Sequence, residues 1–355
     1  MTSRERIEAA LNHKEPDRTP IFEYVMLSPR ADDFLGHPYA ADPENWNTLV
    51  NDLGWESAVK QIATDYLDLA MLLGHDMLYV LPNPLPLSYK TIPSFEPTSD
   101  DPVENVLCRN NFYKENKSDL PEDSFFVYIH LKNEMKNRDI DLPILAPAYE
   151  HGVWTDIDLM QTMLLEPETA HEHFSLATER AFQYIEKYIS LGIDQIGVGG
   201  DFSGSRPLIS PASYREFIVP EVKNISKYIH SRNCYAVNAS DGDLWPVIDE
   251  FLLGCDVDGY IEVDSFAGMN IKKLKDLYGD KITFYGNLDC GNLLSFSSPE
   301  EIKNVTIKCI ESGLGNGGHI LSASNAISGS IPLTNYLAVI EAYREFFGLD
   351  KLSLD

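Results

Sequence analysis

Polar side chains that could carry out acid–base chemistry follow several apolar, strand-like runs of this sequence. The run "CYAV" stops at Asn238, and Asp241 follows it within "VNASDGDLWPVI". Glu262 ends the run "GYIE", and Asp289 follows the run "KITFYG". A carboxyl group can protonate a leaving group when burial raises its pKa. We therefore take Asp241, Glu262 and Asp289 as the catalytic candidates, with Glu262 first.

Other polar residues in equivalent positions are candidates for substrate binding, because amides and carboxylates can orient a small molecule by hydrogen bonding. They are Glu23, Asp201, Asn238, Asn287 and Asn325. Each one alone is more simply explained as a helix N-cap or turn former, and we expect Asp243 and Ser298 to be caps. The set together favours a site, because capping does not require carboxylates after successive strands.

The elements that must position these residues are short strands alternating with helices. Helical spacing is clear at Ile218, Val222, Ile225 and Ile229, which recur at steps of three and four. Strand-like runs occupy residues 19–24, 76–81, 142–147, 194–199, 234–238, 258–263, 281–286 and 318–323. Eight such strands predict an α/β fold, a (β/α)8 TIM-like barrel, in which functional residues gather at the C-terminal ends of the strands.

One segment interrupts this alternation. Residues 83–141 are rich in Pro, Asn, Asp and Lys and contain two strand-like pieces, "NVLCRNNFY" and "FFVYIHL". These pieces predict an inserted β-hairpin. The rest of residues 1–355 is expected to form a single barrel domain.

The charge balance limits the partners. With 28 Lys and Arg against 55 Asp and Glu, the net charge is −27, which argues against binding to nucleic acid or to an anionic membrane. The five cysteines form no CxxC pair, and the first residues lack the apolar region of a signal peptide. We expect a cytoplasmic protein with reduced thiols.

Several blocks of the sequence resemble the uroporphyrinogen decarboxylase superfamily. They are "MTSRERIEAALNHKEPDRTPIF", "SPASYREFIVP", "NASDGDLWPVIDEFLLGCDVDGYIEVDSFAGMNIKKLKDLYGDKITFYGNLD" and "GGHILSASNAISGSIPLTNYLAVIEAYREFFG". The resemblance implies a TIM-like barrel. It also implies one of two activities, porphyrinogen decarboxylation or corrinoid-dependent methyl transfer, in which a methyl group moves between a small molecule and the cobalamin of a partner protein.

Departures from the decarboxylase pattern favour methyl transfer. The decarboxylases have an arginine-rich segment after the first strand, whereas "EYVMLSPRADDFLGH" holds only Arg30. A substrate with eight carboxylates needs several guanidinium groups to pair with them. In addition, the family's catalytic aspartate corresponds to the region of Asn83, and its histidine corresponds to Asn325.

The zinc site of the thiol methyltransferases is not preserved either. Its His-x-Cys pair and its later cysteine correspond to Asn238, Ser240 and Asn325, which are poor zinc ligands. We expect no zinc at these positions, and the sequence leaves open whether another metal binds. His151 with Glu150 and Glu262 would offer oxygen and nitrogen ligands, although a loop histidine is the simpler interpretation. His319 is expected to be structural.

The expected function is transfer of a methyl group from a small methylated donor, of the methoxy or methylamine type, to the corrinoid of a partner protein. The nearest resemblance is to demethylating enzymes of anaerobic metabolism. Reduced cobalamin would be the nucleophile, and Asp241 or Glu262 would protonate the leaving group. Two alternatives remain: a lyase acting on a smaller carboxylate, and a non-catalytic ligand-binding barrel. The donor, the direction of transfer and a homodimeric state stay open.

Overall fold

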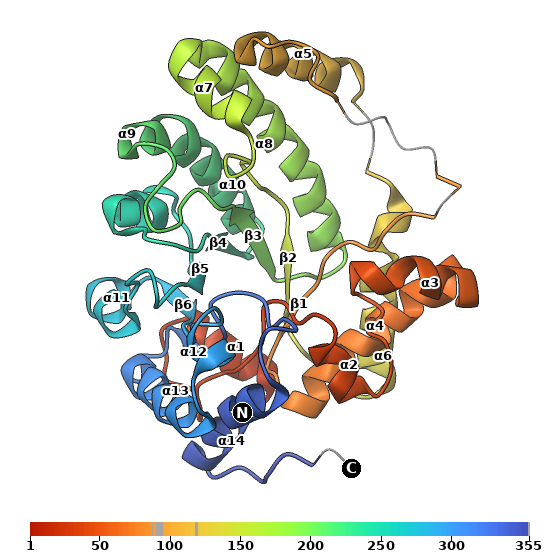
Figure 1. Cartoon of the computed structure of the whole chain (residues 1–355), viewed down its shortest axis with the longest axis vertical. Coiled ribbons are helices and arrows are strands. Elements are labelled where there is room, and N and C mark those ends of the chain that lie inside the picture. Colours follow the sequence, from red (N-terminus) through yellow and green to blue (C-terminus); the bar gives the residue numbers. More distant parts are fainter. Residues whose placement is uncertain (87, 90–94, 118–119, 354–355) are drawn as a thin grey trace. The chain divides into compact units, whose positions relative to one another are not determined.

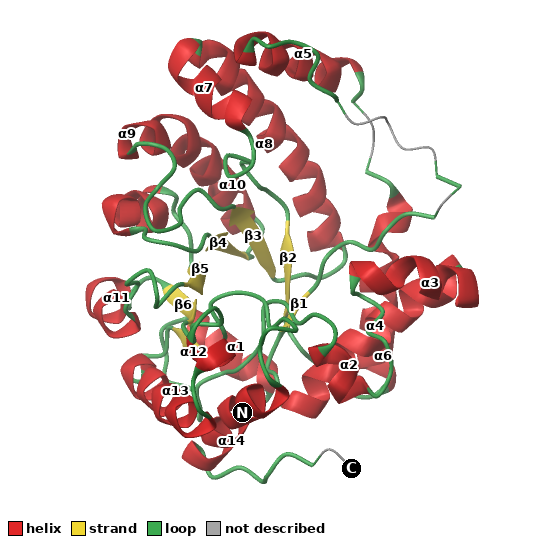
Figure 2. Cartoon of the chain, viewed as in Figure 1, coloured by secondary structure: helices red, strands yellow, loops and turns green. Residues whose placement is uncertain are grey.

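The computed structural model describes residues 1–86, 88–89, 95–117 and 120–353, and the chain forms two compact units. Unit 1 consists of Met1–Asn83, Phe125–Leu145 and Gly259–Asp355. Unit 2 consists of Pro84–Ser124 and Ala146–Asp258. Each unit combines parallel strands with helices, so the predicted α/β class is confirmed (Figures 1 and 2).

Seven strands are present in the described part of the chain. They are β1 (Leu78–Tyr79), β2 (Ile144–Pro147), β3 (Gln195–Gly199), β4 (Tyr235–Ala239), β5 (Gly259–Val263), β6 (Thr283–Gly286) and β7 (His319–Ile320). In unit 1, β1 pairs with the start of β2, and β6 pairs with both β5 and β7. In unit 2, β3 pairs with β4. All these pairs are parallel, as the sequence predicted.

The first predicted strand, residues 19–24, forms only an isolated parallel bridge between Ile21 and Leu321. The Phe22 amide donates to the Leu321 carbonyl at 3.1 Å, but the Ile21 amide donates to the Asp76 carboxylate, also at 3.1 Å. Pro20 has no N–H to add. Only the Phe22 amide of these three residues thus bonds to the 318–323 segment, which leaves residues 19–24 with a single bridge.

The predicted hairpin in residues 83–141 is wrong, because both strand-like pieces are helical. Residues 87, 90–94 and 118–119 lie outside the described residues. "NVLCRNNFY" lies in α5 (Pro102–Glu115), whose N-cap Asp101 accepts a hydrogen bond from the Val103 amide at 2.9 Å. The pair Asp101-Pro102 is a typical helix start, with an N-cap carboxylate followed by proline.

The second piece, "FFVYIHL", lies in the 3-10 turn η1 (Glu122–Phe125) and in α6 (Phe126–Asn137). Val127, Leu131 and Met135 are buried at four-residue steps, which is helical spacing. The β-favouring composition of this run predicts a strand, but its burial pattern is that of a helix. In unit 1, α6 packs against α4, and in unit 2, α5 packs against α7 and α8.

The remaining helices of unit 1 surround its core. They are α1 (Ser3–Leu11), α2 (Arg30–Leu35), α3 (Pro43–Leu53), α4 (Trp55–Leu73), α11 (Ile271–Tyr278), α12 (Leu293–Phe296), α13 (Pro299–Gly313) and α14 (Leu333–Phe346). Along α14, Tyr336, Val339, Ile340 and Tyr343 are buried at three- and four-residue steps. The expected cap at Ser298 is confirmed, since its hydroxyl accepts a hydrogen bond from the Glu301 amide at 3.3 Å.

Unit 2 carries its own set of helices. They are α7 (Ile157–Leu165), α8 (Pro167–Ser190), α9 (Pro211–Ser213), the π-helix η2 (Tyr214–Ile218), α10 (Val219–Ser231), the 3-10 turn η3 (Trp245–Val247) and the π-helix η4 (Glu250–Gly254). The buried face of α10, with Val222, Ile225 and Ile229, packs on β3 and β4. Asp243 accepts a hydrogen bond from the Trp245 amide at 3.1 Å, which fits its predicted capping role. None of the described helices is long and apolar enough to span a membrane.

Candidate functional site

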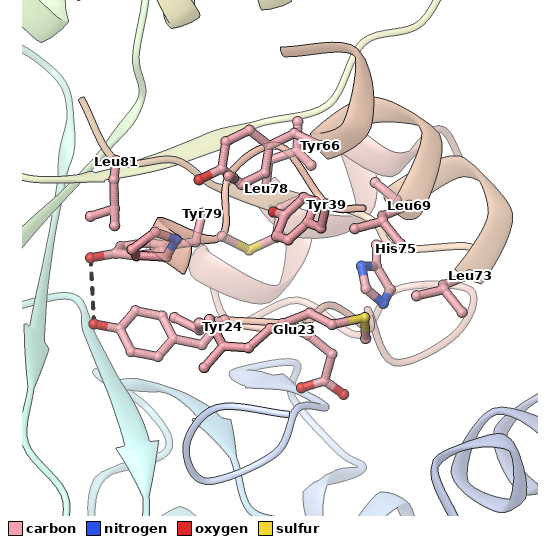
Figure 3. Close-up of a pocket in the computed structure, with 17 residues that line it drawn as sticks. Glu23, Tyr24, Tyr39, Tyr66, Leu69, Leu73, His75, Leu78, Tyr79 and Leu81 are labelled. Carbon is pink, nitrogen blue, oxygen red and sulfur yellow. Dashed lines mark hydrogen bonds between the residues drawn. The ribbon is translucent and has the colours of Figure 1, made fainter. Parts of the chain in front are cut away.

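Unit 1 contains a cavity of about 150 Å³ next to the ends of the 19–24 segment and of β1 (Figure 3). Its walls are mainly apolar and aromatic. They include Glu23, Tyr24, Met26, Tyr39, Tyr66, Leu69, Leu73, His75, Met77, Leu78, Tyr79 and Leu81. Figure 3 shows Glu23 and Tyr24 on one side of the cavity and Tyr39, Tyr66 and Tyr79 on the other. A pocket with apolar walls and few polar groups is the usual form of a small-molecule site.

Glu23 is the acidic residue of this cavity. Its side chain is 8% exposed, and its Oε2 accepts a hydrogen bond from the Ala323 amide at 3.1 Å. Burial removes water from the carboxyl group and raises its pKa to about 8, and the Ala323 amide and the Tyr336 side chain only partly oppose this shift. Glu23 is therefore largely protonated at neutral pH.

Burial also disfavours the charged forms of His75 and Tyr66, two other titratable residues that line the cavity. Burial lowers the pKa of His75 to about 3 and raises that of Tyr66 to about 12. The Tyr24 and Tyr79 rings lie 4.3 Å apart, with their hydroxyl oxygens at 3.5 Å. No Lys or Arg is among the described residues that line the cavity. The cavity is thus suited to an uncharged group that can receive a proton.

Glu262, the first catalytic candidate, lies in a distorted part of β5. Its backbone φ is +71°, and the pairing of β5 with β6 shifts register between Ile261 and Val263. Such a bulge turns a side chain in a new direction, and a non-glycine residue in this conformation carries strain of about 1–3 kcal/mol. Glu262 as a whole is 7% exposed, and its carboxylate accepts a hydrogen bond from Asn325 Nδ2 at 3.4 Å.

Asp289 and Asn287, also in unit 1, mainly contact their own chain. The Asp289 carboxylate accepts hydrogen bonds from the amides of Gly291, Asn292 and Leu293 at 2.9–3.1 Å, which is the geometry of a helix-terminus cap. The Asn287 side chain donates to the Met269 carbonyl at 2.8 Å. These contacts fit positioning better than proton transfer.

In unit 2, Asp201 follows β3 and Asp241 follows β4, whereas Asn238 lies within β4. The Asp241 amide donates to the Asp201 carboxylate at 3.2 Å, and burial raises the pKa of Asp201. Asn238 is fully buried, donates to the Phe251 carbonyl at 3.1 Å and accepts from the Ala239 amide at 3.0 Å. A Cβ at Gly199 would lie 1.9 Å from Asn238 Oδ1, so the close approach of the Asn238 side chain to the backbone at position 199 requires glycine there.

The side chains at the positions of the zinc ligands do not suit zinc. Asn238 and Asn325 are amides whose oxygens already accept hydrogen bonds from the Ala239 and Ala326 amides. Ser240 is a neutral hydroxyl. Amides and hydroxyls are weak ligands for zinc beside Cys and His.

The histidines show no metal-binding cluster. His151 is buried, its Nδ1 accepts from the Val153 amide at 3.3 Å, and burial lowers its pKa to about 4. Within the described residues, no group of three or more His, Cys, Asp and Glu side chains is arranged to hold a metal ion. His319 contacts the Gly286 carbonyl through Nε2 at 2.7 Å, as a structural residue would.

The sequence placed Glu23 among the binding residues but missed the cavity around it. Tyr24 follows Glu23 directly and Tyr79 lies in a predicted strand, so both aromatic residues were visible beside strand ends. Tyr39 and Tyr66 come from a loop and from α4, distant in the sequence. No local pattern links them to Glu23.

Known proteins similar to this chain agree with the fold. A solved methyltransferase from Methanosarcina mazei aligns over 98% of this chain and 99% of its own, with a TM-score of 0.70 and 20% identity. This likeness, with the family match below, confirms the predicted TIM-barrel fold. In sequence, a uroporphyrinogen decarboxylase from Coxiella burnetii is 22% identical over 96% of this chain and 95% of its own.

A methylated-thiol–coenzyme M methyltransferase from Methanosarcina mazei is 26% identical over 180 residues. That alignment covers 51% of this chain and 46% of the relative, so it spans about half of each protein. The family model described as "Uroporphyrinogen decarboxylase (URO-D)" matches residues 155–346, more than half of the 355 residues. The chain therefore belongs to the uroporphyrinogen decarboxylase family.

Proposed function

We propose that this protein transfers a methyl group from a small, uncharged donor of the methoxy type to the corrinoid of a partner protein. The observation that carries the proposal is the buried carboxyl group of Glu23 at the wall of an aromatic cavity with no Lys or Arg among its described residues, where burial raises the pKa of that group. Two relatives are named as methyltransferases, which supports the reaction type. Glu23, rather than Glu262, Asp241 or Asp289, is then our first candidate for the acid.

The residues of the cavity would act on the oxygen side of the reaction. A reduced corrinoid, when bound, supplies the nucleophile that accepts the methyl group. As the carbon–oxygen bond of the donor breaks, its electron pair stays on oxygen, and Glu23 gives that oxygen its proton. The product leaves as a neutral alcohol, and Glu23 remains as a carboxylate. The tyrosine walls hold the donor and exclude water.

The cavity argues against a carboxylate substrate. An ionised carboxylate in an apolar cavity is costly unless a cation pairs with it, and no lysine or arginine is among the described residues of the wall. A methylammonium donor is less favoured than an ether. Its leaving group is already a neutral amine, which has less need of a proton from an acid. Aromatic faces can nevertheless attract a cation, so methylamines belong in the test.

The test compares wild type with Glu23→Gln in a corrinoid assay. A reduced corrinoid protein is mixed with each enzyme and with methyl ethers or methylamines, and the loss of the reduced-corrinoid absorbance gives the rate. Glu23→Gln should bind the donor with a similar Kd but transfer methyl about 10²–10⁴ times more slowly. Glu262→Gln serves as the comparison. If Glu262→Gln loses the activity and Glu23→Gln keeps it, the acid is Glu262.

A further inference from the structure

The cavity around Glu23 is close to the size of one six-membered ring. Its volume is about 150 Å³, and apolar cavities of about 150 Å³ in other proteins take up benzene. Leu81, which is 47% exposed, is one of its lining residues, so the cavity borders the surface just after β1. A small ligand can therefore enter from this side.

Two pairs of tyrosines form much of the wall. The ring centroids of Tyr24 and Tyr79 lie 4.3 Å apart at an interplanar angle of 50°, and those of Tyr39 and Tyr66 lie 6.1 Å apart at 90°. Neither separation leaves room for another ring between the members of a pair. A ligand must therefore lie beside the two pairs, against the faces or edges that they turn to the cavity (Figure 3).

The aromatic wall is held in place by contacts within unit 1. The Tyr39 amide donates to the Asp32 carboxylate at 2.7 Å, and the Tyr39 carbonyl accepts from Asn45 Nδ2 at 3.0 Å. The next amide, that of Ala40, donates to the Asp65 carboxylate at 2.9 Å. A wall that is formed before the ligand arrives needs little ordering on binding, which favours affinity for a small molecule.

The residues of the wall favour an aromatic ligand over an aliphatic one of the same size. Aromatic rings attract one another in offset and edge-to-face arrangements by more than the burial of their area provides. Met26 and Met77 also line the cavity, and thioether sulfurs contact aromatic rings favourably. An ionised ring substituent is disfavoured, since no Lys or Arg is among the described lining residues.

We propose that this cavity is a binding site for a single neutral aromatic ring, and that the methyl donor is accordingly a methoxybenzene. The identity of the donor rests on the function proposed above. In the transfer, the bond between the methyl carbon and the oxygen on the ring breaks, the methyl group goes to the reduced corrinoid, and the electron pair stays on oxygen. Glu23 gives that oxygen its proton, so the product is a neutral phenol.

Binding of simple probes to the protein alone tests the ring site without corrinoid. Isothermal titration calorimetry with methoxybenzene should show saturable binding. Methoxycyclohexane, which carries the same methoxy group on a saturated ring, should bind about three- to tenfold more weakly, because it lacks the aromatic contacts. Methoxynaphthalene is too large for the cavity and para-methoxybenzoate carries an unpaired charge, so neither should compete with methoxybenzene.

Two replacements of Tyr66 form a matched pair at a partly exposed position of α4. Tyr66→Phe keeps the ring and should preserve the preference for methoxybenzene over methoxycyclohexane. Tyr66→Leu keeps an apolar wall without the ring and should reduce that preference. Ala41, which is also partly exposed, lines the same cavity. Ala41→Phe should fill the space and abolish binding of methoxybenzene, with circular dichroism as the check that each variant folds.

The outcomes separate the ring site from the proposed function. Equal affinities of the wild type for the two ethers, an unchanged preference in Tyr66→Leu, or binding of methoxybenzene to a folded Ala41→Phe variant would overturn the ring site. If methoxybenzene binds as expected but no methyl ether methylates the corrinoid, the ring site stands and the proposed function fails. If only aliphatic methyl ethers are demethylated, the proposed function stands and the assignment of a methoxybenzene donor fails.

Discussion

Glu262 Oε1 lies 3.4 Å from Asn325 Nδ2, although 63 residues separate the two in the chain. Glu262 reaches this position from a bulge in β5, with a backbone φ of +71°. A buried carboxylate held in a strained conformation next to an amide is more typical of a functional site than of a stabilising contact. We therefore retain Glu262 as the second candidate for catalysis.

Two replacements of Glu262 separate the strain from the chemistry. Glu262→Ala and Glu262→Gly both remove the carboxylate, but only glycine relieves the strain of the left-handed backbone conformation. The Gly variant should be more stable than the Ala variant by about 1 kcal/mol, as measured by urea unfolding. Asp139, which has a φ of +55° far from any proposed site residue in the sequence, provides the control pair Asp139→Ala and Asp139→Gly. Equal stabilities of the two Glu262 variants would show that the bulge is not strained.

The titration of Glu23 predicts a stability that falls as the pH rises. Its pKa is 4.5 in the unfolded chain and about 8 in the folded protein, so the folded state holds the proton more tightly. Below pH 4.5 both states are protonated and the full stability is present. Between these two pKa values the free energy of unfolding falls by up to about 1.4 kcal/mol per pH unit, and above pH 8 this contribution is constant.

Glu23→Gln lacks this titration and should therefore gain stability relative to wild type between pH 5 and pH 8. Urea unfolding of both proteins across this range measures the difference, in which the contributions of other groups cancel. A difference that is independent of pH would contradict a raised pKa at Glu23.

Asp289 should prove to be a cap. Serine can also accept hydrogen bonds from amides at a helix start, whereas alanine cannot. Asp289→Ser should keep methyl transfer within a few-fold of wild type, and Asp289→Ala should lose about 1 kcal/mol of stability. Circular dichroism melts and the corrinoid assay measure the two effects. A loss of activity in a stable Asp289→Ser variant would restore Asp289 as a catalytic residue.

The sequence predicts those elements of the fold and those site residues whose signal lies in neighbouring residues of the chain. Alternating apolar runs gave seven of the strands, and capping patterns located residues such as Ser298. The strand predicted at residues 19–24 is reduced to one bridge because the Ile21 amide donates its hydrogen bond to Asp76, which is distant in the sequence. The predicted hairpin is wrong because "FFVYIHL" has the composition of a strand, whereas its residues are buried at helical spacing. Likewise, nothing near Glu23 in the sequence reveals Tyr39, Tyr66 or His75, since only packing brings them to the same cavity.

The last prediction concerns Gly313, the final residue of α13. A Cβ at this position would lie 1.8 Å from Nδ1 of His319, which is 3% exposed. The ring cannot move aside freely, because Nε2 contacts the Gly286 carbonyl at 2.7 Å. Gly313→Ala should therefore destabilise the protein by about 1–3 kcal/mol, the usual effect of overpacking.

Gly254→Ala is the matched control, since a Cβ there would meet Glu250 and Val219 at an ordinary 3.5 Å. That variant should be neutral or more stable, because alanine favours a helical backbone. Combining Gly313→Ala with His319→Ala should cost less than the sum of the two single changes, because the clash disappears with the ring. Strictly additive urea-unfolding energies would show that Gly313 and His319 do not constrain each other.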